Sequence, residues 1–285
     1  MAAENVSKSG INFELSYSNS LGAIICILGV ISNMLLLVAF IKDPLKYFRN
    51  SSTYLVMNLA VCDCATCLLG PVFHISVFTT DYSSGWRLIY AYVAYWFGMA
   101  SILSITSISI DRFLMIAYPI KHRILVKGKA MILWLTSIWI VSLCAVGADF
   151  VFGNRKRSEE VILHSFGATI VVFSSVFYVS TCYKLKQQSR SIALQNSTES
   201  RAQEIRILKE KRFLNTIIII ACITFLCILP SIIILKLHGT DYVLGATFMA
   251  IFYINYAVNP LIYIARFPNY RKTFHQLYCL RRSRP

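Results

Sequence analysis

Seven long apolar blocks constrain what this chain can fold into. Their approximate ranges are 21–41, 53–79, 88–118, 130–152, 161–185, 213–235 and 242–265. A helix of about 20 apolar residues is long enough to span the hydrocarbon core of a bilayer. A soluble protein carries about 25% charged residues, whereas charged residues make up 14% of this chain. The sequence therefore predicts an all-α membrane protein with a bundle of seven transmembrane helices.

The basic residues predict how this bundle is oriented. Most of the 28 Lys and Arg residues fall in the segments 42–49, 121–129, 184–212 and 266–284, which all lie on one side of the predicted bundle. Because basic loops stay in the cytoplasm, we expect an extracellular N-terminus and a cytoplasmic C-terminus in a multi-pass protein of the plasma membrane. The net charge of +15 is thus a signal of topology, and we expect no nucleic-acid partner.

Three regions follow from this topology. Residues 1–20 form an extracellular N-terminus, residues 21–265 the seven-helix bundle, and residues 266–285 a cytoplasmic segment. Aromatic and basic residues alternate between positions 267 and 274. This pattern is typical of a short amphipathic helix that lies on membrane lipid, so we expect an eighth helix there, followed by a tail.

Covalent modification is predicted at two residues. Asn5 begins an Asn-Val-Ser sequon on the outer side, which makes it a glycosylation site. Cys279 lies in the inner tail and is a candidate for palmitoylation. None of the nine cysteines falls in an outer loop, so we expect no extracellular disulfide. Cys62, Cys64 and Cys67 lack a second cluster of ligands, and packing at a helix interface explains them better than a metal.

Two charged sites lie inside the predicted membrane helices. Asp63 is the one charged residue between residues 53 and 80, and a carboxylate at this depth must be protonated, paired or open to water. Asp111 and Arg112 stand side by side near the end of the third block. Such a pair needs a partner or an aqueous opening, although an arginine that extends to the lipid headgroups is an alternative.

Short motifs occur in a fixed order along the apolar blocks. Their residues are Asn33, Leu59, Ala60, Asp63, Asp111, Arg112, Phe113, Trp139, Cys227, Pro230, Asn259, Pro260 and Tyr263. This order resembles that of class A (rhodopsin-like) G protein-coupled receptors over nearly the whole chain. The resemblance implies a receptor that binds an extracellular ligand and activates intracellular heterotrimeric G proteins, with arrestin as a second inner partner. Arg87 in place of the usual third-helix cysteine, the missing fifth-helix proline and a short second outer loop together resemble the melanocortin, lipid and nucleoside receptor branch.

The resemblance also implies an activation switch at the inner face. Arg112 would be held by Asp111 and by Glu210 at the foot of the sixth helix, and activation would separate the third and sixth helices. Because Lys209, Lys211 and Arg212 are also charged, Glu210 could instead be a solvated helix residue. The switch residues implied by the family are Asp111, Arg112, Tyr178, Glu210, Asn259, Pro260 and Tyr263.

A sodium site is the second feature that the family implies. Its oxygen ligands would come from Asp63, Ser101, Asn255 and Asn259, with Asn33 close by. Carboxylate, hydroxyl and amide oxygens suit a hard cation, and no other metal or cofactor is expected. The alternative is a protonated Asp63 in a network of hydrogen bonds.

The ligand pocket is expected in the outer half of the bundle. Ala94 stands where amine receptors carry an acid, Tyr253 where opsins carry a lysine, and Ile228 where the family usually has a tryptophan. Together with Tyr95 and Phe252, these residues suggest a peptide or a lipophilic small molecule rather than an amine, since aromatic walls suit such ligands. Ordinary packing is the alternative for the aromatic side chains.

The sequence also bears on functions other than that of a receptor. The chain has no motif of a hydrolase, metalloenzyme or nucleotide-binding loop, so we expect no enzyme. A seven-helix transporter or ion pathway centred on Asp63 is one alternative, and a receptor-like binding protein that does not signal is another. A transporter would have no need for Asp111, Arg112, Glu210 and Tyr263 together at the inner face.

Overall fold

The computed structural model describes residues 2–48, 50–79, 85–126, 128–152, 159–193, 198–237 and 242–279. Over these ranges the chain forms helices and no strand, which confirms the all-α fold class. The helices are α1 (Ala2–Lys42), α2 (Ser51–Thr79), α3 (Gly85–Ala117), α4 (Pro119–Leu125), α5 (Lys129–Phe152), α6 (Glu159–Ala193), α7 (Thr198–Leu237), α8 (Tyr242–Arg266) and α9 (Pro268–Tyr278).

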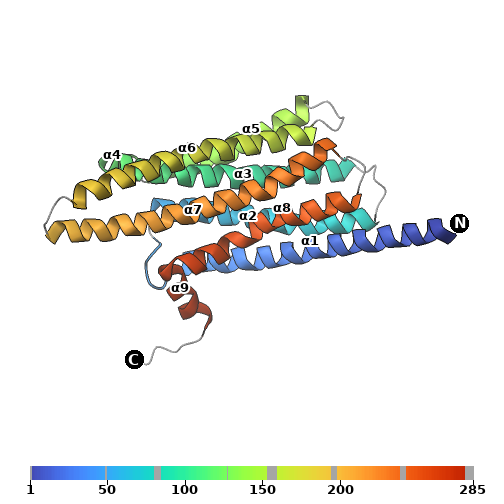
Figure 1. Cartoon of the computed structure of the whole chain (residues 1–285), viewed down its shortest axis with the longest axis horizontal. Helices are drawn as coiled ribbons and strands as arrows, with labels where there is room; N and C mark the ends of the chain where they lie inside the picture. The colour runs from blue at the N-terminus through green and yellow to red at the C-terminus, as the bar shows by residue number, and fades with distance from the viewer. Residues whose placement is uncertain are drawn as a thin grey trace.

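The long helices run alongside one another in a bundle around α3 (Figure 1). Helix α3 packs against α2, α5 and α6, while α1 packs against α2 and α8, and α7 lies between α6 and α8. The short helices α4 and α9 lie at one end of the bundle, and α1 begins at the other end. The main apolar core includes Leu55, Ile108, Leu214 and Tyr263 from four of these helices.

The outside of the bundle is apolar. Ile27, Leu28 and Ile31 on α1 and Leu133 and Ile140 on α5 are each more than half exposed. Stripes of exposed apolar side chains suit contact with lipid rather than water. Among the described residues, four stretches are long and apolar enough to cross a membrane, namely Ser20–Lys42, Ser51–Gly70, Tyr92–Ala117 and Lys129–Ala148.

Several helix ends differ from the sequence-based expectation. Helix α1 begins at Ala2, well before the expected start at residue 21, although its membrane-compatible part begins at Ser20. Helix α3 ends at Ala117 rather than Tyr118, because Pro119 follows and disfavours a helical conformation at Tyr118. Pro119 then begins α4, which was not expected. Helix α7 contains the whole expected cytoplasmic extension 200–213.

Helices α1 and α2 fit together through two glycines and two cysteines. A side chain at Gly29 of α1 would collide with the Cys67 sulfur of α2, and one at Gly70 of α2 would collide with the Cys26 sulfur of α1. Each thiol therefore occupies the space that a glycine leaves on the facing helix. Both thiols are fully buried, and this arrangement agrees with the packing interpretation for Cys67.

Candidate functional site

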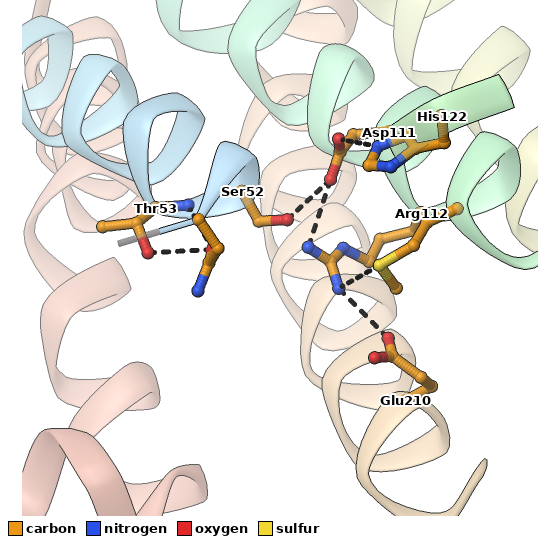
Figure 2. A network of polar contacts seen from close by, with 8 residues as sticks. Ser52, Thr53, Asp111, Arg112, His122 and Glu210 are labelled. Carbon is orange, nitrogen blue, oxygen red and sulfur yellow. Dashed lines mark hydrogen bonds and ion pairs between the residues drawn. The ribbon is translucent and has the colours of Figure 1, made fainter. Parts of the chain in front are cut away.

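A polar network around Asp111, whose side chain is fully buried, closes the end of the bundle at which α4 lies. The Ser52 hydroxyl donates a hydrogen bond of 2.6 Å to one carboxylate oxygen, and Arg112 Nη2 lies 3.1 Å from the same oxygen. His122 Nε2 lies 2.8 Å from the other oxygen. Figure 2 shows these three partners arriving from α2, α3 and α4. Because a buried carboxylate is stable only when it is paired, Asp111 ties the three helices together.

Local structure places two of these partners. Asn50 caps α2, since its side-chain oxygen accepts hydrogen bonds of 3.0 Å from both the backbone nitrogen and the hydroxyl of Thr53. The cap fixes the first turn of α2 and therefore the direction of Ser52 (Figure 2). Pro119 fits the first turn of a helix, and the helix that it begins carries His122 to Asp111.

Arg112 joins α3 to α7 through a second ion pair. Its Nη1 atom lies 3.1 Å from Glu210 Oε2, and the two side chains are 9% and 20% exposed. The same nitrogen lies 3.6 Å from the sulfur of Met115. The structure thus places Glu210 against Arg112 rather than free in solvent (Figure 2).

The two tyrosines of the expected switch are buried close to this network. Neither Tyr178 nor Tyr263 has a hydrogen-bond partner for its hydroxyl in the described part of the chain. Tyr263 stacks on Tyr270 of α9 at a centroid distance of 5.6 Å. Burial raises the pKa of the Tyr270 phenol above its ordinary value. Pro260 lies inside α8, where it removes one backbone donor.

A second polar network lies deeper in the bundle, around Asp63. This side chain is fully buried. The Ser101 hydroxyl donates a hydrogen bond of 2.6 Å to one of its oxygens, and the Asn259 amide donates one of 2.7 Å to the other. The side-chain oxygen of Asn255 instead accepts a hydrogen bond of 2.7 Å from Thr224. The structure therefore brings together three of the four expected sodium ligands.

The donor set around Asp63 fits a hard cation. No Lys, Arg or His in the described ranges forms an ion pair with this carboxylate. The side-chain oxygens of Asn259 and Asn33 are buried without a described hydrogen-bond partner. A sodium ion would supply the positive charge that this site lacks.

Comparison with known proteins identifies the kind of molecule to which these networks belong. The family model described as "7 transmembrane receptor (rhodopsin family)" matches residues 32–263. The chain belongs to this family. It is a G protein-coupled receptor of the rhodopsin-like class, which binds a ligand from outside the cell and couples to G proteins. The comparisons do not favour the alternatives of a transporter or a binding protein without signalling.

Individual relatives of the receptor are distant. It is 24% identical over 290 residues to the allatostatin-A receptor of Bombyx mori, with 89% of this chain and 77% of that protein covered. It is 22% identical over 283 residues to somatostatin receptor type 4 of Rattus norvegicus, with 91% and 72% covered. The crystal structure of squid rhodopsin shares its fold, with a TM-score of 0.78, 20% identity and coverage of 93% and 85%.

Two of the expected ligand-pocket residues of the receptor are in contact, since the ring centroids of Phe252 and Tyr253 lie 6.1 Å apart. Tyr95 packs with Met99 and Val146, and Phe252 packs against Ile102. Tyr253 is buried with Cys26 and Cys67, on the side of α8 that faces α1 and α2. Ala94 is half-buried on α3. The side chains of Ile228, Arg87 and Asn5 lie outside the described part of the receptor, so their predicted roles stay predictions.

Sequence reasoning missed three members of these networks. Ser52 and His122 bind Asp111, and Thr224 holds the carbonyl of Asn255. Two sequence signals could have located the first two of these residues. One is the Asn-x-x-Thr cap beside Ser52, and the other is the proline three residues before His122. Thr224 could not be assigned a partner from the sequence, because a hydroxyl in a membrane helix can also bond to its own backbone.

Proposed function

We propose that the Arg112–Glu210 ion pair is the activation switch of this receptor. In the resting arrangement the pair keeps the inner ends of α3 and α7 together, and an extracellular ligand separates them so that Arg112 can face a G protein. The observation that carries the proposal is the distance of 3.1 Å between the two side chains. Asp111 holds the other side of the guanidinium, which keeps Arg112 in place for Glu210.

The strength of this contact suits a switch. A hydrogen bond between charged groups contributes about 1.5–3 kcal/mol. That amount keeps most molecules in the resting state, yet a ligand that binds the active state more tightly by a similar amount overcomes it. After separation, the unpaired hydroxyls of Tyr178 and Tyr263 become partners for Arg112 and its surroundings, and Asn259 with Pro260 lets α8 adjust.

The ligand proposed for the receptor is a peptide or a lipophilic small molecule. Ala94 offers no acid for an amine, and Tyr95 and Phe252 supply aromatic rings to the proposed pocket. The receptor resides in the plasma membrane with its N-terminus outside. Arrestin and membrane lipid are further partners, it binds no nucleic acid, and it has no catalytic site.

Two other features belong to the same proposal. Sodium bound at Asp63, Ser101 and Asn259, with Asn255 recruited as a fourth ligand, stabilises the resting state. Asn5 carries a glycan and Cys279 a palmitoyl chain beside α9, where the thiol is exposed. Both modifications fit the proposed orientation of the chain.

A ligand screen in cells that report G protein activation tests the proposal. Libraries of peptides, lipophilic small molecules and amines are applied to the wild type, to Arg112→Ala and to Arg123→Ala at matched surface expression. Arg123 is an exposed base on α4, so it controls for the loss of one positive charge at the inner face.

The expected result is a response of the wild type and Arg123→Ala to a peptide or lipophilic compound. Arg112→Ala should bind the same compound and fail to activate. Equal activation by Arg112→Ala would show that Arg112 is not part of the switch. A response to amines alone would overturn the assignment of the ligand class.

A further inference from the structure

Phe213 of α7 covers the guanidinium of Arg112. The Arg112 Cζ atom lies 4.2 Å from the centre of the Phe213 ring. A cation this close to an aromatic face is attracted by the negative charge of the ring system. The two ion pairs of Arg112 use the edge of the guanidinium, through Nη1 and Nη2. The Phe213 ring instead lies over the face of the guanidinium, so the three contacts do not compete for the same atoms.

Phe213 and Glu210 lie on the same side of α7. Residues three apart in a helix are neighbours on its surface, and both of these side chains reach Arg112. Any movement that carries Glu210 away from α3 therefore also removes the ring from the guanidinium. Helix α7 therefore holds Arg112 through two kinds of contact. The ion pair depends on the charge of Glu210, whereas the cation–π contact needs no charge on Phe213.

The ring of Phe213 also connects Arg112 to the neighbouring helices. Phe213 lies against Phe267, which directly precedes α9, at a centroid distance of 5.3 Å. Phe267 in turn stacks on Tyr263 of α8 at 6.2 Å. The row Phe213, Phe267 and Tyr263 thus runs from the guanidinium to the end of α8. These contacts provide a packed connection between α8 at Tyr263 and the ring that covers Arg112.

We propose that Phe213 is a positioning residue for Arg112. Through its aromatic face it holds the guanidinium on α7, and through Phe267 it links this hold to Tyr263. The inference rests on the proposed switch and adds to it a second contact, whose loss weakens the resting state while Glu210 is intact.

The test compares three substitutions at Phe213 in purified receptor reconstituted in lipid nanodiscs. Phe213→Trp keeps an aromatic face, Phe213→Leu keeps an apolar side chain without a ring, and Phe213→Ala removes both. Phe173→Leu is the matched control, because the Phe173 ring is exposed on α6. Glu210→Ala is included to report on the ion pair. A melting curve for each variant verifies that it is folded.

Two measurements separate the inference from the function on which it rests. The first is the distance between two spin labels. Each label is attached to a ketone-bearing amino acid that replaces Arg123 on α4 or Gln203 on α7, both of which are exposed. The second is ligand-independent nucleotide exchange on purified G protein. The first needs no G protein, so it reports the position of α7 whether or not the receptor signals.

We expect Phe213→Leu and Phe213→Ala to lengthen and broaden the label distances. Basal exchange should rise about two- to fivefold, as suits the loss of one cation–π contact. Phe213→Trp and Phe173→Leu should match the wild type. If Phe213→Leu matches the wild type in label distance, the ring has no special role and the inference is wrong, whatever Glu210→Ala does. If the distances change in Phe213→Leu while exchange is unaltered in every variant, Glu210→Ala included, the positioning role stands and the proposed switch fails.

Discussion

Replacement of Glu210 by alanine is the most direct perturbation of the resting state. The substitution removes the partner of Arg112 Nη1 at 3.1 Å. A charge-assisted hydrogen bond contributes about 1.5–3 kcal/mol, and because the Glu210 side chain is 20% exposed, the lower end of this range applies. A change of about 1.4 kcal/mol is tenfold in an equilibrium constant. A receptor that is active in about 1% of molecules would thus become active in about 10%.

The assay is ligand-independent nucleotide exchange in membranes with matched receptor density. Glu204→Ala is the control, since Glu204 is an exposed acid on the same helix, and its loss changes the charge of α7 by the same amount. Glu210→Ala should exceed the wild type about tenfold, and Glu204→Ala should stay within about twofold. Equal activity of the two variants would refute the reasoning, because the effect would then come from the net charge of α7 and not from Arg112.

Three further predictions concern the other sites. Asp63→Asn keeps a group that can bond to Ser101 but removes the charge, so the melting temperature should no longer differ between sodium chloride and choline chloride; a persisting difference would move the sodium site elsewhere. His122→Phe deprives buried Asp111 of one of its three partners and should lower the stability of the purified receptor by about 1 kcal/mol, with little change for a similar substitution at an exposed histidine. Cys279→Ser should abolish hydroxylamine-sensitive palmitate labelling, and an unlabelled wild type would contradict the assignment.

The sequence contained enough information to predict the fold and the position of the two charged sites. Apolar blocks long enough to span a bilayer leave few architectures open, because backbone groups in lipid must be paired within helices. For the same reason Asp63 and Arg112 stood out, since a charge at membrane depth is costly without a function or a partner. The structure places both residues within polar networks.

The details of those networks were less predictable. The contact between α4 and Asp111 depends on the new helix that begins at Pro119. His122 itself showed no feature in the sequence that pointed to this contact. The outer pocket was harder still. In membrane helices that are apolar on most sides, the sequence gives little indication of which side faces the interior. Tyr253 lies toward α1 and α2, which the sequence did not indicate, although its ring also contacts Phe252.

The paired glycines and cysteines between α1 and α2 bear on how the receptor moves. Cys26 and Cys67 each occupy a recess opposite Gly70 and Gly29, so neither helix can slide or rotate against the other without a collision. We therefore expect α1 and α2 to behave as one rigid unit. Helix α7 then moves relative to a rigid part of the bundle. A small displacement of α7 is therefore enough to separate it from Arg112, because α1 and α2 do not move along with it.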